Sequence, residues 1–178
     1  MLREAMAALV AGYLLAACTH VEHSTTVAIA GGSHIRLTML GDTFAQAEDD
    51  RYVVTESGLT TFRRSGRNFV RWQFTIRVKQ PTPLAEIKVE EVSGNAPVLV
   101  LEDRQPRLDH TYWTKQSALI PANPQALPWL YDPETTLRIF RVTITDINAH
   151  TAVLYQPASF NHKAKEAIRF QMGPETPA

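Results

Sequence analysis

The histidines are the first residues to consider for metal binding or acid–base chemistry. Six are present, at positions 20, 23, 34, 110, 150 and 162. A zinc site needs three or four ligands close together, and no His-Glu-x-x-His spacing that would bring two onto one helical face occurs in the chain. Only His20 and His23 are near neighbours. The sequence therefore predicts no metal site, and it assigns no cofactor-binding residue.

The dipeptide Asp109-His110 is the best candidate for part of a hydrolytic triad, because the members of a triad are matched in space and not in sequence. However, no serine lies in the Gly-x-Ser-x-Gly context that presents a nucleophile on a sharp turn. We therefore interpret the dipeptide as part of a solvated loop and assign no catalytic residue. A hydrolase is the least favoured function.

The densest acidic stretch is Glu48-Asp49-Asp50, with Asp42 and Glu56 nearby. Carboxylate oxygens are ligands that calcium prefers, so a calcium site is the chemistry to test here. The stretch lacks the Asp-x-Asp-x-Asp-Gly spacing of a calcium-binding loop. A charged loop exposed to water is the favoured interpretation.

Four arginines surround one turn: Arg63, Arg64, Arg67 and Arg71. Guanidinium groups bind phosphates and carboxylates through paired hydrogen bonds. If Arg63, Arg67 and Arg71 share one face or the turn, they form a candidate binding patch for a lipid head group, a peptidoglycan carboxylate or an acidic partner protein. The alternative, which we favour, is that these charges keep the hairpin soluble and protect an edge strand from pairing.

Two aromatic residues, Trp129 and Tyr131, lie in a segment with four prolines, residues 121–133. Proline removes a donor of the strand ladder and fixes φ, so the segment is expected to be an ordered loop. A rigid loop that presents aromatic rings is a common recognition device for proteins and sugars, which makes both residues binding candidates. The alternative, that the rings cover the core, is favoured because large aromatics are mostly buried.

Alternation of apolar and polar residues predicts the strands that must position these side chains. The clearest run is 69–78, and its apolar members share one face: Val70, Trp72, Phe74, Ile76 and Val78. Residues 138–144 repeat the pattern, with Phe140, Val142 and Ile144 inward. Such runs are typical of strands with one buried face and one wet face.

Weaker runs at 26–30, 35–40, 59–64, 86–92, 98–102, 151–155 and 168–172 are further candidate strands. Turn residues at 65–68, 93–95 and 148–150 join neighbours into three hairpins. Short helices are expected at 42–50 and at 161–167, capped by Asp42 and Asn161.

The pattern predicts an all-β fold, a single antiparallel β-sandwich with one or two short helices; a partly closed barrel is the alternative. Trp72 in a central strand makes the chain similar to immunoglobulin-type sandwiches. The likeness is one of architecture only, because Cys18 is the sole cysteine and the paired cysteines are missing. Architecture alone says nothing about function.

The N-terminus has the features of a targeting signal. Residues 5–17 form an uncharged apolar run of 13 residues, which fits a signal peptide and is too short to span a bilayer. Leu15-Ala16-Ala17-Cys18 follows, and this motif resembles the lipobox of bacterial lipoproteins. The resemblance implies cleavage before Cys18 and a diacylglyceryl group on its sulfur. Two or more acyl chains hold a protein stably on a membrane.

The resemblance implies a signal peptide at 1–17 and a lipidated tether from residue 18, which we extend to residue 26; the strand pattern then predicts a β-sandwich domain at 27–173 and a tail at 174–178. Lipoproteins of this kind belong to the cell envelope. Thr19, where some sorting rules have aspartate, favours the outer membrane over the inner membrane. Lysine plus arginine equal aspartate plus glutamate at 18 each, and this neutrality argues against nucleic acid.

From these observations we expect a non-catalytic binding or assembly module, held on the membrane by Cys18, that keeps an envelope partner protein nearby. The alternative is a ligand-binding or inhibitor lipoprotein that acts on a glycan or a foreign enzyme.

Overall fold

The computed structural model describes residues 22–134 and 136–173. The predicted lipobox with Cys18 and the predicted C-terminal tail lie outside the described residues. In chain order the strands are β1 (Glu22–Ala28), β2 (His34–Leu40), β3 (Thr43–Phe44), β4 (Tyr52–Arg64), β5 (Arg67–Val78), β6 (Leu84–Glu91), β7 (Val98–Asp103), β8 (Tyr112–Gln116), β9 (Ile120–Pro121), β10 (Thr136–Asp146) and β11 (Thr151–Phe160). The helical elements are a 3-10 turn at Ala30–Gly32, α2 (Pro128–Tyr131) and α3 (His162–Met172).

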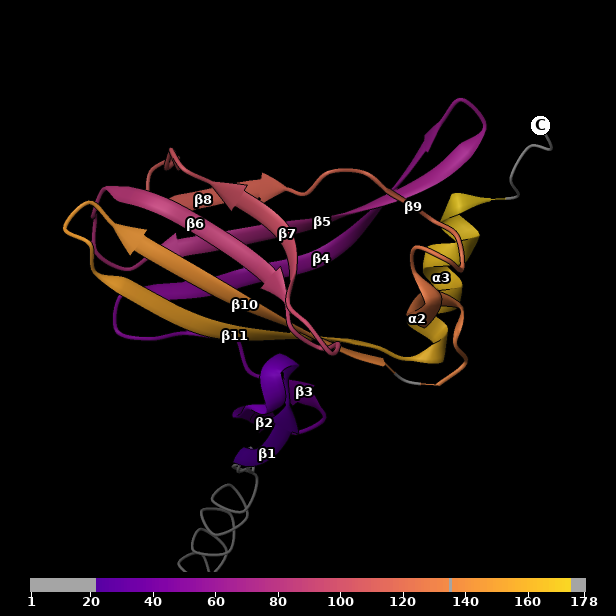
Figure 1. Ribbon diagram of the computed structural model, residues 1–178, viewed down its shortest axis with the longest axis horizontal. Helices are drawn as coiled ribbons and strands as arrows, with labels where there is room; N and C mark the ends of the chain where they lie inside the picture. The colour runs from indigo at the N-terminus through magenta and orange to yellow at the C-terminus, as the bar shows by residue number, and fades with distance from the viewer. Residues whose placement is uncertain (1–21, 135, 174–178) are drawn as a thin grey trace, which may run out of the picture.

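Two antiparallel sheets face each other as a sandwich (Figure 1). One has the strand order β11-β10-β6-β7, and the other has the order β4-β5-β8, with β9 pairing to β5. Among the described residues no strand pairing joins the two sheets, so the architecture is the sandwich and not the partly closed barrel. The predicted all-β class is confirmed.

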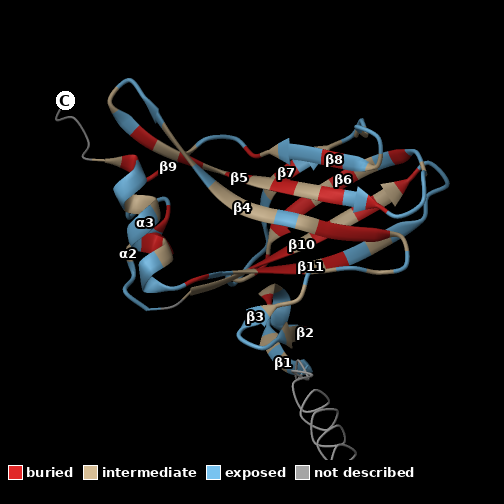
Figure 2. Cartoon of the chain, turned by 180° about the vertical axis from the view of Figure 1, so that it is seen from behind, coloured by how far each residue is buried: buried red, intermediate tan, exposed pale blue. Residues whose placement is uncertain are grey.

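The core lies between the two sheets, and Figure 2 shows the buried residues concentrated along their strands. All five apolar residues of the predicted inner face of β5 are buried, as are Phe140, Val142 and Ile144 of β10. Trp72 is near the centre, with its ring 4.6 Å from that of Phe140. β5 is the central strand of its sheet, as predicted.

The three predicted hairpins are present as β4–β5, β6–β7 and β10–β11. The first is the tightest, with Arg64 opposite Arg67 and a two-residue turn between them. Both turn residues have positive φ, 50° at Ser65 and 76° at Gly66. This geometry matches the right-handed twist of the flanking strands, so the register of the long β4–β5 hairpin is fixed at its tip.

A third sheet, β1-β2-β3, packs through its own small core against the outer side of the large sheet that contains β10. Ile29 and Leu37 contact Val92 and Ile139 there. Residues 22–26, expected to belong to a polar tether, are instead part of β1 and pair with β2. The polar composition of this segment does not favour a strand. Pairing with β2 supplies its backbone hydrogen bonds, and a strand forms for that reason.

Two local predictions were wrong. Residues 42–50 contain the short strand β3 and a turn, not a helix: the Asp49 carboxylate accepts hydrogen bonds from the backbone N–H groups of Arg51 and Tyr52. Residues 168–172 belong to α3 and not to a strand. The predicted cap of that helix is confirmed, because the Asn161 side chain accepts a hydrogen bond from the Ala164 N–H at 2.9 Å.

Candidate binding cavity at one end of the sandwich

The two large sheets diverge toward the end of the sandwich where α2 and α3 lie (Figure 1). α3 contacts β4 of one sheet and β11 of the other, so it spans the opening. Near α2 a cavity of about 680 Å³ lies half-open to solvent. Its walls come from β6–β7 and their connecting loop, from residues 117–120, and from residues 126–129 at the start of α2. Volumes of this size are typical of small-molecule sites.

The inner wall of the cavity is aromatic. Trp72 and Trp129 stack with their ring centroids 6.0 Å apart, and Trp129 also lies 4.9 Å from the ring of Phe160. Trp129 is only 7% exposed. The proline-rich segment therefore places this ring in the core, and the core interpretation holds for Trp129. The same ring lines the cavity.

The outer rim of the cavity is apolar and open to solvent. It is formed by β7, an edge strand whose Val98 and Leu99 are 60% and 55% exposed. Val100, Ile120 and Leu127 continue the apolar lining inward. Exposed apolar side chains that are continuous with a concave apolar wall are characteristic of a binding site.

One ion pair, Glu91–Arg138, stands in this apolar lining. Glu91 lies directly opposite Phe140 in the β6–β10 ladder, so its side chain points into the sandwich. Arg138 precedes Phe140 by two residues and shares the same face. The two side chains are 16% and 19% exposed, respectively. The pair therefore lines the cavity while it is largely withdrawn from water.

The Arg138 guanidinium also lies over the ring of Trp129, with 5.4 Å between its central carbon and the ring centroid. Its Nη2 donates to the Glu91 carboxylate, whereas its buried Nε has no hydrogen-bond partner among the described residues. Burial raises the pKa of Glu91, and the charge of Arg138 opposes this effect only in part. The cavity lining thus contains the Arg138 guanidinium, with one unpaired N–H donor, beside the Glu91 carboxyl group, whose ionised form is disfavoured by burial.

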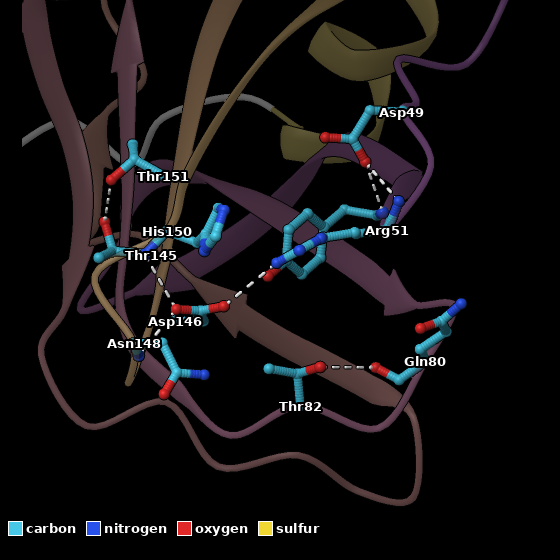
Figure 3. A network of polar contacts seen from close by, with 10 residues as sticks. Asp49, Arg51, Gln80, Thr82, Thr145, Asp146, Asn148, His150 and Thr151 are labelled. Carbon is cyan, nitrogen blue, oxygen red and sulfur yellow. Dashed lines mark hydrogen bonds and ion pairs between the residues drawn. The ribbon is translucent and has the colours of Figure 1, made fainter.

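The opposite end of the sandwich holds a polar network (Figure 3). The buried Asp146 carboxylate accepts hydrogen bonds from the backbone N–H groups of Asn148 and His150 and from the Arg51 side chain at 3.3 Å. Burial, and then the charge of Asp146, raise the pKa of the neighbouring Tyr52 hydroxyl. These contacts join the start of β4 to the β10–β11 turn.

The arginine cluster is only partly as expected. Arg64, Arg67 and Arg71 share the outer face of the β4–β5 hairpin, as the register Arg64↔Arg67 and Thr60↔Arg71 requires. Arg63 does not: it pairs with Asn68, which is buried on the inner face. The guanidinium of Arg71 lies 3.8 Å from the ring centroid of Phe62, on the outer face.

Tyr131 is half-buried, and its hydroxyl donates to the Ala122 carbonyl at 2.5 Å, which fixes the proline-rich segment. Asp109 and His110 are exposed on a loop, with 3.8 Å between their charged groups, and neither lines the cavity. Glu48 pairs with Lys79. Within residues 22–134 and 136–173, no group of three or more histidine, cysteine, aspartate or glutamate side chains has a metal-binding arrangement.

Sequence reasoning missed Glu91 and Arg138, although a signal was available. The alternation that turned Phe140, Val142 and Ile144 inward also turns Arg138 inward, and an inward arginine is unusual in a core strand. The cavity itself had no such signal.

Comparison with protein-family models, with curated proteins and with solved structures gives no match to this chain. In the part of the chain that the structure describes, no helix combines the length and apolarity needed to cross a bilayer.

Proposed function

We propose that this chain is a lipid-anchored binding protein of the bacterial cell envelope and that it holds an apolar ligand in the cavity beside α2. The observation that carries the proposal is the cavity of about 680 Å³, which the chain's own side chains leave unfilled between Trp129 and the exposed β7 rim. A half-open cavity of this size with a largely apolar lining has the volume and the composition of a small-molecule site.

The lining favours binding over catalysis. Most of it is aliphatic or aromatic, and its charged members, Glu91 and Arg138, are engaged with each other. A hydrolytic site would need a nucleophile beside a base, and the cavity's one serine, Ser117, donates its hydroxyl to the Ala118 carbonyl. The role proposed for the cavity is therefore to hold an apolar molecule and release it unchanged.

The anchor follows from the lipobox, with Cys18 as the lipidated residue. β1 begins at Glu22, four residues later, so a fully extended linker would span at most about 14 Å. The folded domain would therefore stay close to the membrane surface, most simply that of the outer membrane. A short linker suits a module that exchanges an apolar ligand with a bilayer.

Binding can be tested with phenylnaphthylamine, an uncharged apolar dye that fluoresces when it leaves water. The mature chain from residue 18 with Cys18→Ser can be used, because it carries neither the apolar run 5–17 nor the lipidation site, and both would otherwise require detergent. We expect saturable fluorescence that Leu99→Glu weakens, since this change places a charge at the rim. Leu119→Glu is the matched control: Leu119 is exposed but does not line the cavity. Equal binding by both variants would remove the cavity as the site.

The anchor is tested separately by cell fractionation. The wild-type protein is expected in the membrane fraction with a covalently attached lipid, and Cys18→Ser is expected to lose both properties. Lipid still attached to the Cys18→Ser protein would contradict the proposal.

A second candidate function is the assembly role, with an acidic envelope partner bound at the arginines. It is favoured by one observation: Arg64 and Arg67 are exposed at the tip of a hairpin that projects beyond the sandwich (Figure 1). Cross-linking in intact cells separates the two functions, because a discrete acidic partner lost with Arg64→Glu and Arg67→Glu is expected only for the assembly role.

A further inference from the structure

Two arginine–glutamate pairs link β10 to β6, and they lie on opposite faces of one sheet. Arg141 pairs with Glu90 on the outer face at 2.8 Å, where Lys88 contacts the same carboxylate. Arg138 pairs with Glu91 on the inner face, beside the cavity. The pairs use neighbouring residues and the same chemistry, so what differs between them is the surroundings.

In the outer pair, both oxygens of the Glu90 carboxylate are in contact with donors. Glu90 accepts from two nitrogens of Arg141, and its other oxygen lies 2.8 Å from Lys88. These contacts, first the hydrogen bond from Lys88, lower the pKa of Glu90 against the effect of burial. Such a pair is complete without any ligand.

The inner pair is incomplete on the arginine side. An arginine side chain carries five N–H donors, and Glu91 accepts from Nη2 of Arg138. The Nε atom is buried without an acceptor among the described residues. A buried donor without an acceptor is unfavourable, so the guanidinium gains when it shifts toward a ligand that supplies acceptor oxygens. Arg138 thus has an N–H donor in excess of the acceptors around it, which favours a ligand with acceptor oxygens.

Glu91 is the group that such a ligand would replace. Burial raises its pKa, so this carboxyl is held on the arginine at a cost, and a second carboxylate can take its place while Glu91 binds a proton or turns toward solvent. A carboxylate presents two oxygens in the geometry that a guanidinium recognises. The rest of the cavity remains apolar.

We infer that Arg138 is the anchoring residue for an apolar ligand with a single carboxylate head, such as a fatty acid, and that Glu91 is the internal competitor which the head displaces. The apolar chain occupies the space between Trp129 and the β7 rim, and the carboxylate bonds to the Arg138 guanidinium. This inference rests on the proposed function, because it names the ligand class of the same cavity.

The test compares three ligands with equal chains: decanoate, decanol and decylamine. Each is titrated at neutral pH into the mature chain from residue 18 carrying Cys18→Ser, with phenylnaphthylamine displacement as the readout. Decanoate is expected to bind about tenfold or more tightly than decanol, since hydrogen bonds to charged groups contribute that much. Decylamine is expected to bind most weakly, because its ammonium group would meet Arg138.

Four variants locate the preference. Arg138→Gln is expected to remove the advantage of decanoate over decanol and to change decanol binding less than threefold. Glu91→Gln is expected to tighten decanoate several-fold, because the competing charge is gone. Arg141→Gln and Glu90→Gln are the matched controls on the outer face of the same strands and should leave the ratio unchanged. Thermal unfolding checks that each variant folds; if Arg138→Gln does not, Glu91→Gln alone still decides.

The outcomes separate the inference from the proposed function. Equal binding of decanoate and decanol, or a preference for decylamine, overturns the role of Arg138 while the cavity remains an apolar binding site. Unchanged decanoate binding in Glu91→Gln also overturns it. If none of the three ligands displaces the dye, and the dye itself binds no better than to Leu99→Glu, the proposed function fails.

Discussion

The two ends of the sandwich use the same ionic chemistry in opposite ways. At the turn end, a buried carboxylate is the centre: Asp146 receives two backbone N–H groups and Arg51 (Figure 3). At the α2 end, a largely buried guanidinium is the centre, and Arg138 has Glu91 and an aromatic face but retains a donor without an acceptor. The Asp146 carboxylate has donors on both of its oxygens, whereas the Arg138 guanidinium keeps a donor that no described residue accepts.

The difference follows from chain connectivity. At the turn end, strands β10 and β11 meet in a tight connection whose own backbone supplies two of the three donors to Asp146. At the α2 end, apart from the two-residue turn of the β4–β5 hairpin, the segments 93–97 and 117–127 pass around a cavity instead of across the core. A tight turn closes an end with backbone groups, whereas long connections leave a lining of side chains, and this lining can be selective for a ligand.

The strongest test of this comparison is Trp129→Ala. Trp129 packs against Trp72 and Phe160, and removing a buried aromatic side chain costs about 3–5 kcal/mol of unfolding free energy. Chemical denaturation measures the effect, with Tyr112→Ala as control, because Tyr112 is exposed and its loss should cost under about 1 kcal/mol. A small cost for Trp129→Ala would mean that the α2 end is not part of the cooperative core.

The turn end is tested by Asp146→Ala. The change leaves two backbone N–H groups and the Arg51 side chain without their acceptor, and we expect a loss of about 2–3 kcal/mol. Binding of phenylnaphthylamine at the other end should not change. Arg51→Gln should cost less than about 1 kcal/mol, since this side chain is 40% exposed. An altered dye affinity in Asp146→Ala would show that the ends are coupled.

The contributions of Glu91 and Glu90 to stability should change with pH in opposite directions. The native pKa of Glu91 is raised, so its ionisation opposes folding, and its share of stability is lost as pH rises above the ordinary value near 4.5. The native pKa of Glu90 is lowered, so its contribution is present above that pH and is lost as pH falls through the native pKa.

Unfolding free energies of Glu91→Gln and Glu90→Gln, measured against wild type from about pH 3 to pH 7 so that the range extends below the ordinary glutamate pKa, check this pair. The Glu91→Gln protein should gain relative to wild type with rising pH, on the order of 1 kcal/mol, and the Glu90→Gln protein should lose. If the two variants showed the same pH dependence of unfolding free energy, the surroundings of Glu91 and Glu90 would shift their pKa values in the same direction.

The contrast between the ends also shows what could be predicted from sequence. The alternation of β5 and β10 predicted the core correctly because each residue's face depends on its immediate neighbours. The strand predicted at residues 168–172 was wrong, because so short an apolar run fits both a strand and a helix. In α3, Phe170 is 87% exposed, and the buried Lys165 bonds to the Asp132 carbonyl and the Thr136 hydroxyl.

The cavity could not be predicted in this way. Its existence depends on the paths of the segments 93–97 and 117–127, which are set by contacts between residues distant in sequence. The inward direction of Arg138 and Glu91 could be predicted from the alternation of their strands, whereas the packing of Trp129 against Trp72 could not.

The smallest expected effect on stability concerns the arginine hairpin, which projects beyond the α2 end. Arg64 and Arg67 are exposed on its outer face, so Arg64→Glu with Arg67→Glu should change the unfolding free energy by less than about 0.5 kcal/mol. Decanoate binding should not change either, because neither residue lines the cavity. If decanoate binding instead weakened steeply, and added salt reproduced the loss, the hairpin would be attracting the carboxylate toward the cavity from a distance. The α2 end would then consist of two cooperating surfaces, and the comparison with the turn end would have to include both.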